Sequence, residues 1–368
     1  MKILIICSDP GSLVNFRYEL IKQILSKSHE VHCCGPSLND EINKMLKDLG
    51  VVYHEVGFIR NKIAPLADIK NIFSLYMLYK SVNPDRILAY TIKPVIWGGI
   101  ANRFYAKSKF FALITGLGYT FNNDNQYKSI FRRITIFLYK ISLYGSTTVI
   151  FQNKDNLKVF LNEKIITDKQ SNLVNGSGVD LSFFRYEPLS ISLDFVMIAR
   201  LLIDKGVYEY IRSAKNVKKL YPTANFTLIG PSEDSFNSVN IEEINNLHSK
   251  GIIHYVGPVD DVRKFLRRAN IFVLPSYHEG IPRSSLEAMA MGRPLITTNA
   301  PGCRDTIIDY SNGRLVKPKS KKDLTEKIIW MIENNGKWQQ MGLASYKMAK
   351  NKFDVRLVNK AMMEILNI

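Results

Sequence analysis

The sequence reads Pro275-Ser-Tyr-His-Glu279-Gly280-Ile281-Pro282-Arg283-Ser284-Ser-Leu-Glu287-Ala-Met-Ala-Met-Gly292-Arg-Pro294 between two short apolar runs, Ile271–Leu274 and Leu295–Thr298. We expect a strand, an irregular turn held by Gly280 and Pro282, a helix that begins near Ser284, and a second strand. A β-α-β unit of this kind builds a parallel sheet covered by helices. This stretch therefore predicts an α/β fold.

Apolar runs alternate with helical patterns on both sides of this unit. In the first half we expect strands at 2–7, 30–34, 51–56, 86–89 and 110–115, and helices at 15–26, 40–49 and 65–80. In the second half we expect strands at 193–198, 225–229, 252–256, 271–274, 295–298 and 315–316, and helices at 207–220, 241–248, 260–268, 284–291, 324–333 and 338–349. The pattern predicts two doubly wound, Rossmann-like domains facing across a cleft, with ligands at the carboxyl ends of the strands.

The length of 368 residues is typical of two domains, and the glycine-containing stretch 175–180 is the expected boundary. We expect an N-terminal Rossmann-like domain at 1–175, a linker at 176–190 and a C-terminal Rossmann-like domain at 191–346. The remaining residues, 347–368, are expected to form a helix that packs back on the first domain.

The composition limits the classes of partner and of cellular setting that we expect. The net charge is +17, divided nearly equally between the two halves, which suits nucleic acid, anionic lipid or phosphorylated small molecules as partners. The four cysteines lack metal-ligand spacing, so we expect a reduced, cytoplasmic setting. No apolar stretch approaches the ~18 residues that a membrane span requires.

The turn and helix at 279–287 place chemistry at a strand end. The unpaired N–H groups and the positive dipole end of the helix suit a phosphate or a sugar hydroxyl. Glu279 lies on the turn and Glu287 one turn into the helix, so both carboxylates can face one pocket and accept hydrogen bonds from sugar hydroxyls. Ser284-x-x-Glu287 also matches a capping box, in which Glu287 only satisfies the helix N-terminus.

The run from Glu279 to Glu287 resembles the E-x7-E signature of retaining family 4 glycosyltransferases, which have the GT-B fold. The resemblance continues to Pro294, through Pro301-Gly-Cys-Arg304, and upstream through Ala199-Arg200-Leu-Leu-Ile-Asp-Lys205-Gly206. It implies that Arg200 and Lys205 neutralise the departing diphosphate, with Glu279 on the donor sugar. These three are the candidate catalytic residues. Candidate donor-binding residues are Gly11, Ser12, Gly230, Gly280, Ile281, Pro282, Arg283, Ser284 and Glu287.

The first domain is expected to hold the acceptor. Arg17 opens the helix after the first strand and can meet an acidic or phosphorylated acceptor. Thr115, Gly116 and Gly118 lie where family members place acceptor contacts, although this chain lacks the histidine that many relatives carry nearby. The loop at Gly11 lacks the G-x-G-x-x-G pattern of a dinucleotide site.

The stretch Tyr127–Tyr144 is basic and amphipathic. One face, expected to cover the core, carries Ile130, Phe131, Ile134, Phe137, Leu138 and Ile141. The opposite face carries the candidate membrane-facing residues Lys128, Arg132, Arg133 and Lys140, mixed with Ile136, Tyr139 and Leu143. Such a face suits anionic lipid, whereas a core helix with a solvated basic side is the alternative.

The resemblance implies transfer of a hexose or N-acetylhexosamine, GalNAc or GlcNAc as the best choice, from a UDP-sugar. The implied acceptor is an undecaprenyl-diphosphate-linked saccharide of bacterial O-antigen or lipopolysaccharide synthesis, on the inner face of the cytoplasmic membrane. No Asp-x-Asp motif is present, and we expect no metal or other cofactor. The alternatives are a non-hydrolysing UDP-sugar epimerase of the same fold and a basic nucleic-acid-binding protein. The second lacks any nucleic-acid-binding motif, so we expect no nucleic-acid partner.

Overall fold

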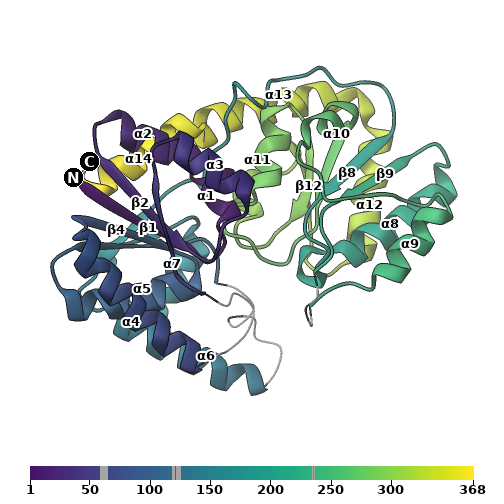
Figure 1. Cartoon of the computed structure of the whole chain (residues 1–368). Coiled ribbons are helices and arrows are strands. Elements are labelled where there is room, and N and C mark those ends of the chain that lie inside the picture. The colour runs from purple at the N-terminus through teal and green to yellow at the C-terminus, as the bar shows by residue number, and fades with distance from the viewer. Residues whose placement is uncertain (59–64, 118–120, 122–125, 234, 236) are drawn as a thin grey trace. The chain divides into compact units, whose positions relative to one another are not determined.

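The computed structural model describes residues 1–58, 65–117, 121, 126–233, 235 and 237–368. The chain divides into two compact units, residues 1–177 with 358–368, and residues 178–357. Each unit is built on its own parallel sheet, with seven described strands in the first and six in the second (Figure 1). Two Rossmann-like domains were expected from the alternation of strands and helices, and this fold class is confirmed.

The first unit has the strand order β3-β2-β1-β4-β5-β6-β7. Its strands are β1 (Lys2–Ile6), β2 (Glu30–Gly35), β3 (Val52–Glu55), β4 (Arg86–Tyr90), β5 (Lys109–Ile114), β6 (Thr148–Phe151) and β7 (Ser171–Leu173). Its helices are α1 (Gly11–Phe16), α2 (Tyr18–Ser26), α3 (Asp40–Asp48), α4 (Pro65–Val82), α5 (Ile92–Tyr105), α6 (Gln126–Leu143) and α7 (Lys154–Asn162). The last helix of the chain, α14 (Val355–Leu366), sends Met362, Met363 and Leu366 into the core of this unit.

Successive residues of β1 point to opposite faces of the first sheet. Leu4 and Ile6 pack into one hydrophobic cluster with residues of α4, α5 and α6. Ile3 and Ile5 pack into a second cluster with residues of α1, α2, α3 and α14. Helices therefore cover both faces, and Figure 1 shows α4, α5 and α6 together on one side of the sheet.

The second unit has the strand order β10-β9-β8-β11-β12-β13. Its strands are β8 (Asp194–Ile198), β9 (Asn225–Ile229), β10 (His254–Gly257), β11 (Ile271–Leu274), β12 (Leu295–Thr298) and β13 (Gly313–Val316). Its helices are α8 (Val207–Leu220), α9 (Ile241–Ser249), α10 (Arg263–Arg268), α11 (Arg283–Ala290), α12 (Lys321–Glu333) and α13 (Trp338–Met348), followed by a π-helical turn at Ala349–Phe353. β8 and β11 are neighbours at the centre, so the loops that follow them meet at one edge of the sheet.

The sequence patterns did not identify helix α5. Its residues Pro94, Gly98 and Gly99 are poor helix formers, which weakens the sequence signal. Tertiary packing explains Gly99, because a Cβ atom there would lie 2.2 Å from Oγ of Ser142 on α6. Only glycine lets α5 and α6 approach this closely, so the two helices form one layer.

The expected orientation of α6 is wrong. Ile136, Tyr139 and Leu143 are buried in the core, whereas the face expected to cover the core is turned outward. Its exposed members are Ile130, Phe131, Ile134 and Phe137, and Leu138 and Ile141 are partly buried. Both sides of this helix carry apolar residues, so periodicity alone did not distinguish them. The contact at Gly99 does, because Ser142 and its neighbours must face α5.

Candidate functional site

The loop after β11 is held by its neighbours in the second unit. The amide of Tyr277 donates to the carbonyl oxygen of Asp204 at 2.8 Å, and the amide of Glu279 donates to that of Pro301 at 3.0 Å. Gly302 has a φ of 78°, and a Cβ atom there would lie 2.2 Å from the carbonyl oxygen of Gly280. Pro301-Gly302 therefore supports the loop from beneath, a role that sequence reasoning did not assign.

Lys205 and Glu279 form an ion pair across two strand ends. Lys205 ends a short 3-10 turn after β8, and its Nζ lies 2.6 Å from Oε1 of Glu279. The side chains are 14% and 16% exposed. Gly206, at a φ of 74°, lets the turn press against the loop, since a Cβ atom would lie 2.2 Å from the carbonyl oxygen of Pro275. The structure thus brings together two of the three candidate catalytic residues.

Arg200 follows β8 and is paired with Glu233, a residue that sequence reasoning missed. Its Nη1 donates to both carboxylate oxygens of Glu233, at 2.9 and 3.1 Å. The arginine side chain is 39% exposed, so solvent reaches part of it. Because an anionic ligand and Glu233 would compete for the same donors, Glu233 can hold Arg200 in place until a phosphate arrives.

Glu287 lies one turn into α11 and accepts a hydrogen bond from Nε of Arg283 at 3.0 Å. Helix α11 begins at Arg283 after Pro282, so Ser284 lies inside the helix and does not cap it. The capping-box interpretation of Glu287 is therefore wrong. Burial raises the pKa of Glu287, and the charge of Arg283 opposes that rise.

The other candidate donor residues of the second unit lie in this loop, in the first turn of α11 and after β9. Gly280, Ile281 and Pro282 are buried, and Ser284 is partly exposed in the first turn of α11. The N–H groups of this first turn have no partner within the helix, and the dipole there favours a negative charge. Gly230 follows β9 at a φ of 143°, and a Cβ atom there would lie 1.9 Å from the carbonyl oxygen of Ala199. Packing alone therefore requires glycine at position 230.

Tyr277 adds a polar contact to the same loop. Its hydroxyl donates to Oε1 of Glu209 on α8 at 2.8 Å. Burial is the main cause that raises the pKa of Tyr277, with Glu209 adding to it. Sequence reasoning missed this pair because no short motif links residues 68 positions apart.

The candidate residues of the first unit surround the start of α1. Gly11 is the first residue of α1, and its amide donates to Oδ1 of Asp9 at 3.1 Å. The hydroxyl of Ser12 is buried and lies 2.7 Å from that of Tyr90. Arg17 separates α1 from α2, and its guanidinium lies 5.2 Å from the centre of the Tyr90 ring. Ser12 and Arg17 thus both contact the tyrosine at the end of β4.

The remaining first-unit candidates divide into three groups. Thr115 and Gly116 follow β5 and are partly exposed, whereas Gly118 lies outside the described residues. Arg132 is paired with Glu163, at 2.5 Å between Nη2 and Oε1. Among the remaining candidates on α6, Arg133 and Lys140 are exposed, and the side chain of Lys128 lies outside the described part.

Within the described part of the chain, no group of three or more His, Cys, Asp or Glu side chains could hold a metal ion. None of the helices that the structure describes is long and apolar enough to cross a membrane. The geometry at the ends of β8 and β11 instead combines fixed cations, carboxylates and a helix N-terminus. Such a set suits a ligand with both phosphate groups and hydroxyl groups.

Comparisons with known proteins agree with this chemistry. The family model described as glycosyl transferases group 1 matches residues 187–348, and the model described as glycosyl transferase 4-like matches residues 2–153. The N,N'-diacetylbacillosaminyl-diphospho-undecaprenol alpha-1,3-N-acetylgalactosaminyltransferase of Campylobacter jejuni is 31% identical, over 91% of this chain and 90% of its own length.

A second relative and a solved structure extend the likeness. The UDP-Gal:alpha-D-GlcNAc-diphosphoundecaprenol alpha-1,3-galactosyltransferase of Escherichia coli is 25% identical, over 69% of this chain and 68% of its own length. The crystal structure of HepE from Anabaena in complex with UDP matches with a TM-score of 0.80 and 17% identity, covering 100% of both chains. At this identity the structural likeness shows the fold alone.

Proposed function

Because this chain belongs to the family 4 glycosyltransferases, which have the GT-B fold, we propose that it transfers an N-acetylhexosamine or hexose from a UDP-sugar to an undecaprenyl-diphosphate-linked saccharide. GalNAc or GlcNAc is the preferred donor sugar. The names of the two relatives support this choice, since one is an N-acetylgalactosaminyltransferase and both names include a diphosphoundecaprenol-type substrate. The product would belong to O-antigen or lipopolysaccharide synthesis at the inner face of the cytoplasmic membrane.

The observation that carries the proposal is the ion pair between Lys205 and Glu279, with Arg200 on the same strand end as Lys205. A diphosphate leaving group gains negative charge as its bond to the sugar breaks. Two fixed cations in a partly buried site stabilise that charge without reorganisation. Glu279, held in place by Lys205, is positioned to accept hydrogen bonds from hydroxyls of the donor sugar.

Glu287 is assigned to the ribose of the nucleotide. Its side chain is 15% exposed and oriented by Arg283, so one carboxylate can bind two neighbouring hydroxyls. Gly11 and Ser12 of the first unit are assigned to the donor phosphate, and Arg17, Thr115, Gly116 and Gly118 to the acceptor.

We propose retention of the anomeric configuration. The bond between C1 of the sugar and the phosphate oxygen breaks, and the bond between C1 and the acceptor oxygen forms on the same face. The acceptor proton passes to an oxygen of the departing phosphate. Arg200 and Lys205 neutralise the nucleoside diphosphate, so this step is proposed to need no metal.

A panel of nucleotide sugars tested against lipid-diphosphate saccharides, with product masses as the readout, tests the proposal. We expect a product that is heavier by one sugar residue only when both substrates are present. Formation of an epimer from the donor alone would instead support the epimerase alternative. The anomeric coupling of the product, read by NMR, tests retention, and unchanged turnover in EDTA tests metal independence.

A further inference from the structure

Large apolar side chains are exposed on the outward faces of α4, α5 and α6 in the first unit. They are Ile69, Phe73 and Met77 on α4, Phe104 on α5, and Ile130, Phe131, Ile134 and Phe137 on α6. Phe104 is 73% exposed and Phe73 is 64% exposed. Helix α5 packs against both neighbours, so these residues form one surface, which we call the α4–α6 face. Contiguous apolar surface of this kind marks an interaction site.

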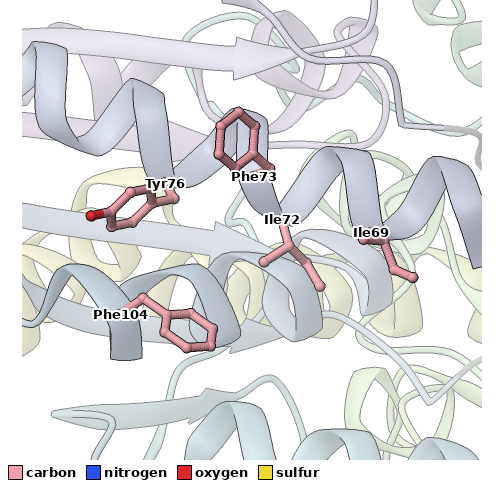
Figure 2. Close-up of a pocket in the computed structure, with 5 residues that line it drawn as sticks. All are labelled: Ile69, Ile72, Phe73, Tyr76 and Phe104. Carbon is pink, nitrogen blue, oxygen red and sulfur yellow. The ribbon is translucent and has the colours of Figure 1, made fainter.

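The face is hollowed between α4 and α5. A shallow groove of about 400 Å³ is lined by Ile69, Ile72, Phe73, Tyr76 and Phe104. Figure 2 shows Ile72 of α4 directed toward the helix that carries Phe104, with Tyr76 farther along α4. The lining side chains consist only of carbon and hydrogen, apart from the hydroxyl group of Tyr76, so the groove suits a hydrocarbon chain.

The three helices carry charge of nearly one sign, and Glu163, which follows α7, adds one carboxylate beside Arg132 of α6. The three helices contain eight lysine and arginine residues and a single acidic residue, Asp68, which leaves seven net positive charges. Asp68 is buried and paired with Lys93 at 3.0 Å, so it presents no negative charge outward. Lys70, Lys80, Arg103, Arg133 and Lys140 are exposed among the apolar residues. Nζ of Lys80 lies 5.2 Å from the centre of the Tyr76 ring, at the edge of the groove.

We infer that the α4–α6 face docks on an anionic lipid bilayer, with the apolar side chains inserted between headgroups and a lipid chain in the groove. The exposed lysines and arginines then meet the phosphates, as in interfacial amphipathic helices. Two copies of this chain would bring like charges together on this face, so charge favours a bilayer over a second copy. A nucleic acid would leave the isoleucine and phenylalanine side chains without an apolar partner.

This inference deepens the membrane location within the proposed function, and its test needs no sugar. Purified protein is sedimented with vesicles of phosphatidylcholine alone or with added phosphatidylglycerol. We expect binding to the anionic vesicles that weakens as salt is raised. Equal binding to both vesicle types would overturn the inference.

Two variants separate the charged part from the apolar part. Each basic residue near an anionic surface contributes about fivefold in affinity, so R133E/K140E is expected to weaken binding by ~25-fold or more. The matched control K215E/K219E changes the same charge on the exposed surface of α8 and is expected to bind nearly as wild type. If the two variants lose binding equally, net charge alone is responsible and the assignment of this face is wrong.

The apolar variant F73S/F104S/F137S is expected to lose at least about tenfold in vesicle binding, whereas I191S/L220S/L343S, with three exposed apolar residues of the second unit, is not. All six side chains are exposed, so folding, followed by thermal melting, is expected to be unchanged. In brominated lipid, F104W is expected to show quenching that I191W does not. If the apolar variant instead dissociates a dimer in sedimentation velocity and still binds vesicles, the face is an interface between copies.

A negative result for membrane docking can be told apart from a negative result for the proposed transferase function. The same F73S/F104S/F137S variant is expected to keep wild-type turnover on a water-soluble, short-chain acceptor, because its residues lie outside the assigned active site. Loss of that turnover together with vesicle binding would show that the face serves the reaction and not the bilayer.

Discussion

Replacing Lys205 by alanine removes the ammonium group that lies 2.6 Å from Glu279. Two effects follow, and the structure separates them. The first is structural, because Glu279 keeps a carboxylate that is 16% exposed and has lost this cation. The second is catalytic, because the departing diphosphate loses a fixed positive charge.

The structural effect is expected to be moderate. An exposed ion pair contributes about 0–1 kcal/mol, whereas removing one partner of a buried pair costs about 3–5 kcal/mol. Lys205 and Glu279 lie between these cases, so we expect a loss of ~2 kcal/mol. For a unit of this size that lowers Tm by about 4–8 °C. The catalytic effect is expected to be larger, a ~100- to 1000-fold fall in turnover, as for loss of one fixed donor to a developing negative charge.

The assay measures kcat and KM for the UDP-sugar together with thermal melting. Lys205→Ala is compared with Glu279→Ala, with the double variant K205A/E279A, and with Lys215→Ala, an exposed lysine on α8. The double variant is expected to recover part of the lost Tm, because the carboxylate that faced Lys205 is removed as well, and to recover none of the lost turnover.

A near-normal turnover in Lys205→Ala, with the expected fall in Tm, would show that the pair is structural only and that Lys205 has no catalytic role. Recovery of turnover in the double variant would also contradict it. In that case Lys205 would act only by neutralising Glu279.

Three further predictions rest on other parts of the structure. A Cβ atom at Gly11 would meet nothing closer than Oδ1 of Asp9 at 3.4 Å, so Gly11→Ala should leave Tm unchanged. If the donor phosphate lies beside Gly11, the same variant should raise the KM for the donor about tenfold. An unchanged KM would show that Gly11 is not part of the donor site. All four cysteines are buried, and burial raises the pKa of Cys7 and of Cys303 to about 12. The native protein should therefore not react with a thiol reagent at pH 8, whereas the denatured chain should show four reactive thiols. Rapid labelling of the native form would contradict this prediction. Burial and His32 lower the pKa of His54, so the unfolded chain takes up a proton at this residue before the folded protein does as the pH falls below about 6.5. Tm should therefore fall between pH 7.5 and 5.5. The variant His54→Gln should show a smaller fall.

The fold class and the main residues of the candidate site could be predicted from the sequence because both depend on short-range patterns. The apolar runs at Ile271–Leu274 and Leu295–Thr298 appear as strands β11 and β12 at those residues. The spacing from Glu279 to Glu287, together with Arg200 and Lys205, depends on residues that directly follow strands, where an α/β sheet places its ligands.

Short-range patterns were therefore enough to predict the alternation of strands and helices, the family, and the candidate residues at the ends of β8 and β11. The partners of these residues and the direction in which α6 faces depend on tertiary contacts, which such patterns do not contain. Glu233 lies 33 positions from Arg200, and no local pattern connects them. Helix α6 has apolar residues all round, so its buried side depends on the close approach of α5 at Gly99. The same contact turns Ile130, Ile134 and Phe137 outward, because a helix that packs on one side must expose the other.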